Sequence, residues 1–182
     1  RSYLQTNTYV SKLSAHIVKK VADKLNSLYN TDRETFEKVW EDIKVFIEYG
    51  MLTDEKFCES AMKYALLVDT EKQYFNFEEY KTLIKDNQTD KDGNLVYLYA
   101  TDKEDQYTHI KAATEKGYNV LMMNGQLDSH FIGMLEQKFE KSRFARVDAD
   151  VISNLIPKDN KKDSDITPLQ RTITTTLFKS QV

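Results

Sequence analysis

Apolar residues in the first third of the chain recur at steps of three and four, the spacing of one face of an α-helix. One stripe predicts a helix from about Thr8 to Tyr29, and a second stripe predicts a helix that Gly50 ends. Up to about residue 90 the pattern indicates only helices. The two stripes consist of Val10, Leu13, Ile17, Val21, Leu25 and Leu28, and of Phe36, Val39, Trp40, Ile43, Phe46 and Ile47.

Helix starts are indicated by small polar residues, whose side chains accept a hydrogen bond from a free backbone amide of the first turn. A glutamate three residues later completes a capping box. On this basis helices are expected to start at Thr31 with Glu34, at Thr53, at Asn76 with Glu79, at Thr101 with Glu104, and at Asp128.

The second half of the chain alternates short runs of β-forming residues with helical patterns. The runs cover Leu95–Ala100, Asn119–Met123 and Ser142–Ala149. Strands separated by helices pair in parallel through right-handed crossovers. We therefore predict a mostly α, α/β protein, in which a helical bundle region precedes a small αβα layer with a three-stranded parallel sheet.

The last part of the chain is polar and then becomes apolar again. Residues 157–166 are expected to form a linker, and Thr167 with Pro168 is a good helix start. The helix expected over 167–182 has a single apolar stripe. Such a helix needs a partner surface, so the chain is expected to stop inside a further domain.

Composition excludes several classes of protein. The 182 residues contain 26 Lys and Arg against 29 Asp and Glu, a net charge of −3, which argues against a general nucleic-acid binder. No apolar run approaches the roughly 20 residues of a membrane-spanning helix. Cys58 is the only cysteine and is expected to be structural, and a reducing compartment is expected.

Candidate chemistry is sparse. The stretch Asp90–Asn94 lacks the spacing of a calcium loop and is expected to be a turn. The three histidines have no metal-ligand spacing, and no glycine-rich phosphate loop occurs. The alternative to a scaffolding module is a small α/β signalling or ligand-binding module, which should show a polar pocket at the carboxyl edge of its sheet. The residues expected at that edge are Thr101, Asp102, Asn124, Gly125 and Asp148.

Several stretches, in their order along the chain, resemble the middle domain of the ninety-kilodalton heat-shock chaperones, the Hsp90 family, and in particular its bacterial HtpG type. They are RSYLQ (1–5), HIVKKVADKL (16–25), FEKVWEDIKVFIEYG (36–50), FNFEEYKTLIKDNQ (75–88), NLVYLYATD (94–102), KGYNVLMMNGQLDSHFIGMLEQKF (116–139) and DITPLQRTI (165–173).

The resemblance implies a domain organisation. Residues 1–70 would form the end of a large middle segment and connecting helices, and 71–156 the small αβα segment of the middle domain. A linker over 157–166 would lead to the first helix of a C-terminal dimerisation domain, 167–182. The N-terminal ATP-binding domain would lie outside this chain, and a plain carboxyl edge of the sheet would be expected.

The resemblance also implies a function, that of the middle-domain fragment of an ATP-dependent molecular chaperone that assists protein folding. The fragment would couple ATP binding and hydrolysis in the N-terminal domain to binding of client proteins. It is expected to be no enzyme by itself and to bind no cofactor and no metal, while the parent protein binds ATP and Mg²⁺. Expected partners are unfolded or partly folded clients, the N-terminal ATPase domain, and a second copy through the C-terminal domain. Neither nucleic acid nor membrane is expected as a partner, and the expected location is the cytoplasm.

Two sets of site residues follow from the resemblance. Arg1 and Gln5 match an arginine and a glutamine that face the nucleotide site, where the arginine contacts the γ-phosphate of ATP. The helix after residue 127 resembles part of a client-facing surface, so Phe131, Ile132 and Met134 are candidate client contacts. At Ser129 and His130 the chain departs from an acidic residue and a tryptophan that bacterial relatives often carry. The competing interpretation is that these side chains pack on the small sheet, above all Phe131 and Leu135.

Overall fold

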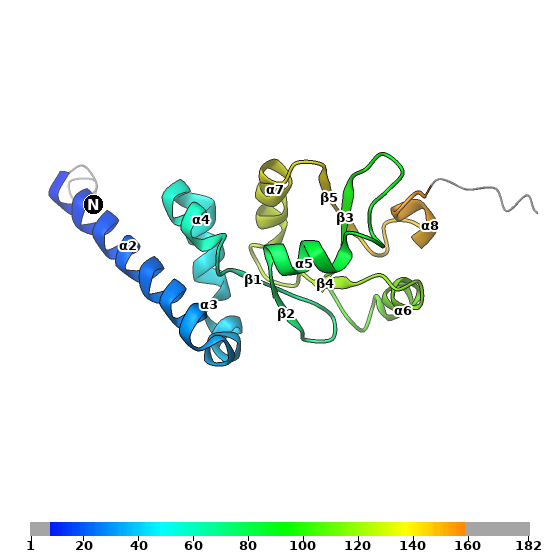
Figure 1. The fold of residues 1–182 in the computed structure, drawn as a ribbon, viewed down its shortest axis with the longest axis horizontal. Coiled ribbons are helices and arrows are strands. Elements are labelled where there is room, and N and C mark those ends of the chain that lie inside the picture. The colour runs from blue at the N-terminus through cyan, green and yellow to red at the C-terminus, as the bar shows by residue number, and fades with distance from the viewer. Residues whose placement is uncertain (1–7, 159–182) are drawn as a thin grey trace, which may run out of the picture.

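The structure is a computed structural model, and it describes residues 8–158. The expectations for Arg1 and Gln5, and for the helix over 167–182, concern residues outside this range. Helices α2 (Thr8–Thr31), α3 (Arg33–Thr53) and α4 (Glu55–Ala61) pack on one another at one end of the long axis (Figure 1). The αβα layer occupies the other end.

Aspartates cap the second and third of these helices. The side chains of Asp32 and Asp54 each accept a hydrogen bond from the amide three residues later, at 3.0 and 2.9 Å. The expected caps, Thr31 and Thr53, were wrong by one residue. Each threonine is the last residue of the preceding helix, and its hydroxyl donates to the carbonyl four residues back. An aspartate immediately follows each threonine and is an equally good or better cap.

Gly50 lies inside α3 and does not end it, contrary to the sequence-based prediction. A Cβ atom added at Gly50 would lie 2.7 Å from Cε1 of Phe57. The missing side chain therefore lets the Phe57 ring of α4 approach the backbone of α3. The role of this glycine is close packing of two helices, not termination of α3.

A two-stranded antiparallel hairpin joins the helices to the αβα layer, and the sequence pattern did not predict it. Strand β1 (Leu66–Val68) pairs with β2 (Tyr74–Asn76), and the Asp69 carboxylate holds the turn by accepting two backbone amides. A bridge from Asp69 to Leu121 places β1 beside the main sheet. β1 is only three residues long and follows α4 after residues 62–65, so its apolar residues look like a continuation of the helical pattern, which explains why the strand was not predicted.

The three-stranded parallel sheet was correctly predicted. Strand β3 (Leu95–Ala100) lies between β4 (Val120–Met122) and β5 (Ser142–Arg146), in the order β4-β3-β5, with both pairings parallel. The Asn76–Glu79 capping box is also confirmed, at the start of α5 (Phe77–Ile84). The other helices of the layer are α6 (Tyr107–Glu115), α7 (Asp128–Lys138) and α8 (Ile152–Leu155).

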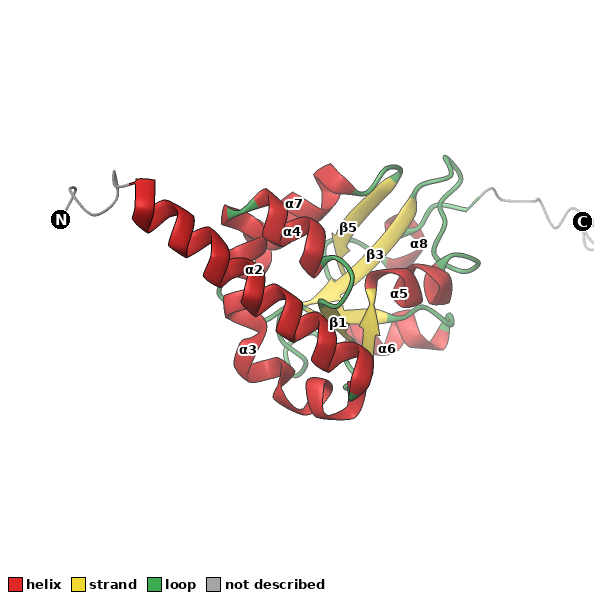
Figure 2. Ribbon diagram, turned by 60° about the vertical axis from the view of Figure 1, so that its left-hand side comes forward, coloured by secondary structure: helices red, strands yellow, loops and turns green. Residues whose placement is uncertain are grey.

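Alternate residues of β3 pack on opposite faces of the sheet. Leu95 and Tyr97 belong to the apolar core that reaches α3, α5 and α7, whereas Val96 and Leu98 belong to a second core under α6 and α8 (Figure 2). This alternation is the period of a strand that is buried on both faces. The first core is continuous from α2 to the sheet, so the helices and the layer share it.

Two predicted helix starts in the αβα layer, at Thr101 and at Asp128, were not confirmed as helix caps. Helix α6 begins at Tyr107, because Asp102 accepts the amides of Glu104 and Asp105 and holds a separate turn. Asp128 is the first residue of α7 and makes no capping bond. Its side chain instead takes part in the cluster described below.

Candidate functional site

Helix α7 carries the candidate client contacts, and the structure separates them by burial. Phe131 is 3% exposed, and its ring centroid lies 6.5 Å from that of Phe77 on α5. Ile132 and Met134 are partly buried against the same core. Phe131 is therefore part of the core that includes the sheet residues Leu95 and Tyr97, as the competing interpretation expected. Client contact at Ile132 and Met134 stays a prediction.

Met134 covers the only cysteine. Its sulfur lies 3.8 Å from Sγ of Cys58, which is fully buried on α4. Burial raises the pKa of the Cys58 thiol, and Lys138 opposes this only in part. A buried thiol with a raised pKa is a poor nucleophile, as expected for a structural cysteine.

The first turn of α7 is fixed by a buried charge cluster, the Lys44 cluster, which consists of Lys44, Glu48 and Asp128. Nζ of Lys44 lies 3.1 Å from each carboxylate oxygen of Asp128 and 3.6 Å from Oε1 of Glu48. The side chains are 14%, 3% and 3% exposed, in the order Lys44, Glu48, Asp128. Asp128 also accepts the amide of Gly125 at 2.7 Å. The cluster therefore joins α3 to α7 across 84 residues of sequence.

Glu48 has an unusual protonation equilibrium in this cluster. The pKa of Glu48 is raised to about 8, with burial as the largest cause; Lys44 opposes the rise, and the neighbouring Asp128 adds to it. Only a weak signal for this group is present in the sequence, because Lys44 and Glu48 are four residues apart and lie beside the buried Ile47. Asp128 was identified only as a helix start.

A second ion pair connects the last turn of α7 to α4. Nζ of Lys138 lies 2.6 Å from Oε1 of Glu55, the first residue of α4. Lys138 is partly exposed and Glu55 is largely exposed, so this pair contributes less than a buried one. The two ion pairs fix α7 at its beginning to α3 and at its end to α4.

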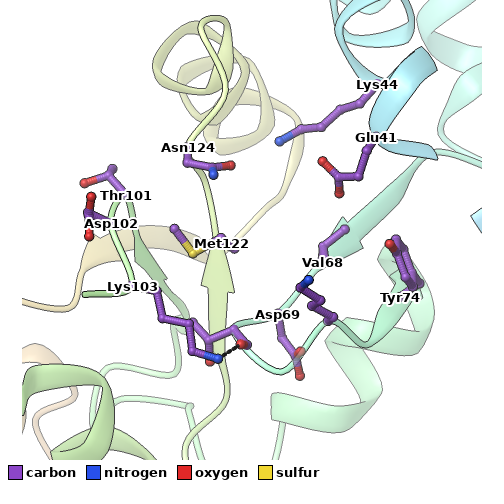
Figure 3. Close-up of a pocket in the computed structure, with 12 residues that line it drawn as sticks. Glu41, Lys44, Val68, Asp69, Tyr74, Thr101, Asp102, Lys103, Met122 and Asn124 are labelled. Atoms are coloured by element: carbon purple, nitrogen blue, oxygen red, sulfur yellow. Dashed lines mark hydrogen bonds between the residues drawn. The ribbon is translucent and has the colours of Figure 1, made fainter. Parts of the chain in front are cut away.

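A polar cavity of about 450 Å³ opens at the carboxyl edge of the sheet (Figure 3). The plain edge expected from the resemblance was therefore wrong. Thr101, Asp102 and Asn124 do line it, as expected for this edge, whereas Gly125 and Asp148 are not part of its lining. The cause is the β1–β2 hairpin, which adds a wall that the sequence pattern did not predict.

Most charged groups of this cavity already have partners. Lys44 extends from α3 toward Asn124 (Figure 3). Its ammonium group pairs with Asp128. Lys103 donates to the carbonyl of Thr70, and Asp69 accepts backbone amides of its own turn. The cavity carries equal numbers of lysine and acidic side chains, so it has no strong preference for an anion or a cation. The charged lining residues are Glu41, Lys44, Asp69, Lys72, Asp102 and Lys103.

The apolar stripe of the first helices is only partly covered. Phe46, expected to be buried, is 74% exposed, and Tyr49 is 61% exposed. Together with α2 they border an apolar groove of about 520 Å³. Helical stripes look alike in cores and interfaces, so the pattern could not separate these cases. The other exposed apolar residues on α2 and α3 are Leu13, Ile17, Val21 and Val45.

These features define a class of protein before any comparison. Within residues 8–158, no three metal-ligating side chains come together, and no helix is long and apolar enough to cross a bilayer. The helical unit is fixed to the small αβα layer by the Lys44–Asp128 and Lys138–Glu55 ion pairs. This arrangement is typical of a structural or binding module.

Comparison with known proteins identifies the family. The sequence model described as "Hsp90 protein" matches residues 1–180, and the chain belongs to the Hsp90 family. It is 58% identical over its whole length to Chaperone protein HtpG of Bacteroides thetaiotaomicron and 50% identical to that of Porphyromonas gingivalis. It covers 27% of each relative, so it spans about a quarter of their length. HtpG of Legionella pneumophila is 27% identical over 143 residues, which are 75% of this chain and 22% of that protein.

A solved structure gives independent support for the fold. The middle domain of a heat shock protein of Plasmodium falciparum superposes with a TM-score of 0.60 at 14% identity, covering 80% of this chain and 61% of that one. At this identity the likeness concerns the fold alone. The mostly helical architecture with its three-stranded parallel sheet is therefore that of an Hsp90 middle domain.

Proposed function

We propose that this chain is the middle-domain part of an ATP-dependent molecular chaperone and couples nucleotide state to the binding of client proteins. The observation that carries the proposal is the match of the whole chain, at 58% identity, to a chaperone HtpG, on a fold that superposes with an Hsp90 middle domain. The alternative, a signalling or ligand-binding module, explains neither likeness. The chain would function within a longer protein.

The division of labour follows from this assignment. ATP and Mg²⁺ would be bound by the N-terminal ATPase domain, so the isolated fragment is expected to show no turnover. A C-terminal domain would form the homodimer, and the expected location is the cytoplasm. Of the proposed segments, 1–70 and 71–156 meet inside the turn of the β1–β2 hairpin.

Arg1 and Gln5 would act on the nucleotide of the neighbouring domain. A guanidinium is always charged and contacts phosphate oxygens through two parallel hydrogen bonds. Placed at the γ-phosphate, Arg1 would stabilise charge on the transferring phosphoryl group, and Gln5 would contribute polar contacts. Because this contact forms only when the domains meet, it would favour the closed state when ATP is bound.

Clients would be contacted by the exposed side of α7. Ser129 and His130 are exposed, and Ile132 and Met134 are partly buried beside them. Unbranched, polarizable methionine side chains suit surfaces that accept many partners. The support for this step is the position of these residues on one helix, anchored at both ends.

The test uses the full-length protein that contains this chain. We expect Arg1→Ala to lower ATP turnover at least tenfold while ATP affinity changes less than threefold, because the lost contact exists mainly in the transition state. Lys20→Ala, an exposed change on α2, is the matched control and should leave turnover unchanged. Suppression of aggregation of a heat-denatured enzyme gives the chaperone readout. A wild-type protein that neither turns over ATP nor suppresses aggregation would contradict the proposed function.

A further inference from the structure

The Lys44 cluster contains two buried carboxyl groups and one ammonium group, which borders the cavity at the edge of the sheet. If both carboxyl groups are ionised, the cluster carries one uncompensated negative charge. Burying such a charge is costly, and a buried acid avoids the cost by keeping its proton. These three groups lie at the junction between α3 and α7.

We propose that the Lys44 cluster is a proton-dependent latch, which holds the first turn of α7 against α3 while Glu48 is neutral and loosens it when Glu48 ionises. With Glu48 protonated, Lys44 is free to pair with Asp128 alone. With Glu48 ionised, two carboxylates compete for the same ammonium group. The Lys44–Asp128 pair then weakens, and this pair is what fixes the start of α7 to α3.

The distances agree with this order of preference. Lys44 is already closer to Asp128, at 3.1 Å, than to Glu48, at 3.6 Å. Because the pKa of Glu48 is raised to about 8, Glu48 ionises at a pH close to the physiological range. Protonated Glu48 dominates below that pH, and the latch opens as the pH rises through it.

The surroundings supply no second cation to the cluster among the described residues. Lys44 of α3 and Asp128 of α7 are the charged groups that act on Glu48. Glu41, one turn before Lys44, is exposed, and His130 on α7 is also exposed. The segment before α7 contributes the amide of Gly125, which already bonds to Asp128.

The latch bears on the exposed side of α7. Ile132 lies one turn after Asp128, and Met134 lies two residues further along the helix. Loosening the first turn would change how both side chains are presented. This consequence for clients rests on the proposed chaperone function, whereas the latch itself concerns only the contact between two helices.

The test is hydrogen–deuterium exchange of the full-length protein, read in peptides covering residues 124–133 and corrected for the intrinsic effect of pH. We expect protection of the α7 first turn to fall about tenfold between pH 6.5 and pH 9, because ionisation of Glu48 destabilises the closed contact. Peptides from α6, on the other face of the sheet, serve as the internal reference and should not change. Glu48→Gln, which keeps the shape but cannot ionise, should remove the pH response.

Two outcomes would overturn the latch. One is equal pH dependence in the α7 and α6 peptides of the wild-type protein, which reports global opening and can be read even if the variant does not fold. The other is an unchanged pH response in a folded Glu48→Gln protein. Glu41→Gln, at the exposed position on the same helix, is the matched control and should retain the wild-type response. None of these readings depends on ATP turnover or client binding, so failure of the latch and failure of the proposed function are distinguishable.

Discussion

Arg33 and Glu79 form a two-pronged ion pair that connects the helical unit to the αβα layer. Nη1 of Arg33 lies 3.0 Å from Oε1 of Glu79, and Nη2 lies 2.9 Å from Oε2. Glu79 at the same time accepts the amide of Asn76 at 2.8 Å and completes the cap of α5. The guanidinium also lies 4.8 Å from the ring centre of Tyr29. One carboxylate thus caps the start of α5 and connects two parts of the chain.

The pair should contribute acid-sensitive stability. The hydrogen bond from Arg33 lowers the pKa of Glu79, so the carboxylate stabilises the folded state above its unfolded pKa, and this stability is lost as the pH falls through the folded pKa. Because the pair is partly exposed, we expect Glu79→Gln to cost about 1 kcal/mol at pH 7. Urea unfolding at pH 7 and pH 3 measures this, and a difference from wild type that stays constant with pH would contradict it. Glu78→Gln, on the exposed side of the same turn, is the control.

The two helical glycines Gly50 and Gly133 should respond to alanine in opposite directions. At Gly50 the new methyl group would lie 2.7 Å from the Phe57 ring, whereas at Gly133 no atom lies within 4 Å of it. We expect Gly50→Ala to destabilise by roughly 1–3 kcal/mol through overpacking. Gly133→Ala should stabilise by roughly 0.5–1 kcal/mol, because alanine is the better helix former. Chemical denaturation of both variants is the measurement, and equal signs would refute the packing argument.

The corrected helix caps can be tested pairwise. Asp32 accepts the first-turn amide of α3, and Thr31 bonds back into α2. Asp32→Ala should therefore lower the unfolding temperature, and Thr31→Ala should lower it less, because only Asp32 caps the first turn of α3. Thermal unfolding of the two variants checks the order. If Thr31→Ala is the more damaging change, the helix starts where the sequence pattern placed it.

Cys58 should be protected from thiol reagents by the native fold. It is fully buried beneath Met134, and burial raises the pKa of its thiol. We expect an aromatic disulfide reagent at pH 8 to label it at least 100-fold more slowly in the native protein than in 6 M urea, because the thiolate must first be exposed. Rapid native labelling would show that α4 and α7 separate readily.

The sequence predicted those features of the fold that depend on local periodicity. The parallel sheet, the Asn76–Glu79 box and the turn at Asp90–Asn94 follow from patterns a few residues long, and the structure has all three. The pattern did not predict strand β1, because three consecutive apolar residues are too few to show a period. The predicted cap positions were wrong by one residue where a threonine precedes an aspartate, because either side chain can accept a hydrogen bond from an amide of the first turn.

The candidate site depended more on contacts between distant residues. Lys44 and Asp128 meet only in the folded chain, 84 residues apart, so no local pattern could pair them. Phe46 and Phe131 both lie on apolar stripes, yet one is 74% and the other 3% exposed. Whether an apolar residue on a helical stripe is buried or exposed depends on the elements that pack against it in the fold. Arg1 and Gln5 rest on the resemblance, and their roles stay predictions.

The continuous core that runs from α2 to the sheet has a mechanical consequence. The described chain begins on α2 and ends after α8, at opposite ends of the long axis (Figure 1). Shared apolar packing makes the intervening residues one stiff body, with the Arg33–Glu79, Lys44–Asp128 and Lys138–Glu55 pairs between the helices and the layer. Because the sheet also carries the second core with α8, a rotation of α2 would move this body as a whole, and we expect it to displace α8 more than the helices near α2.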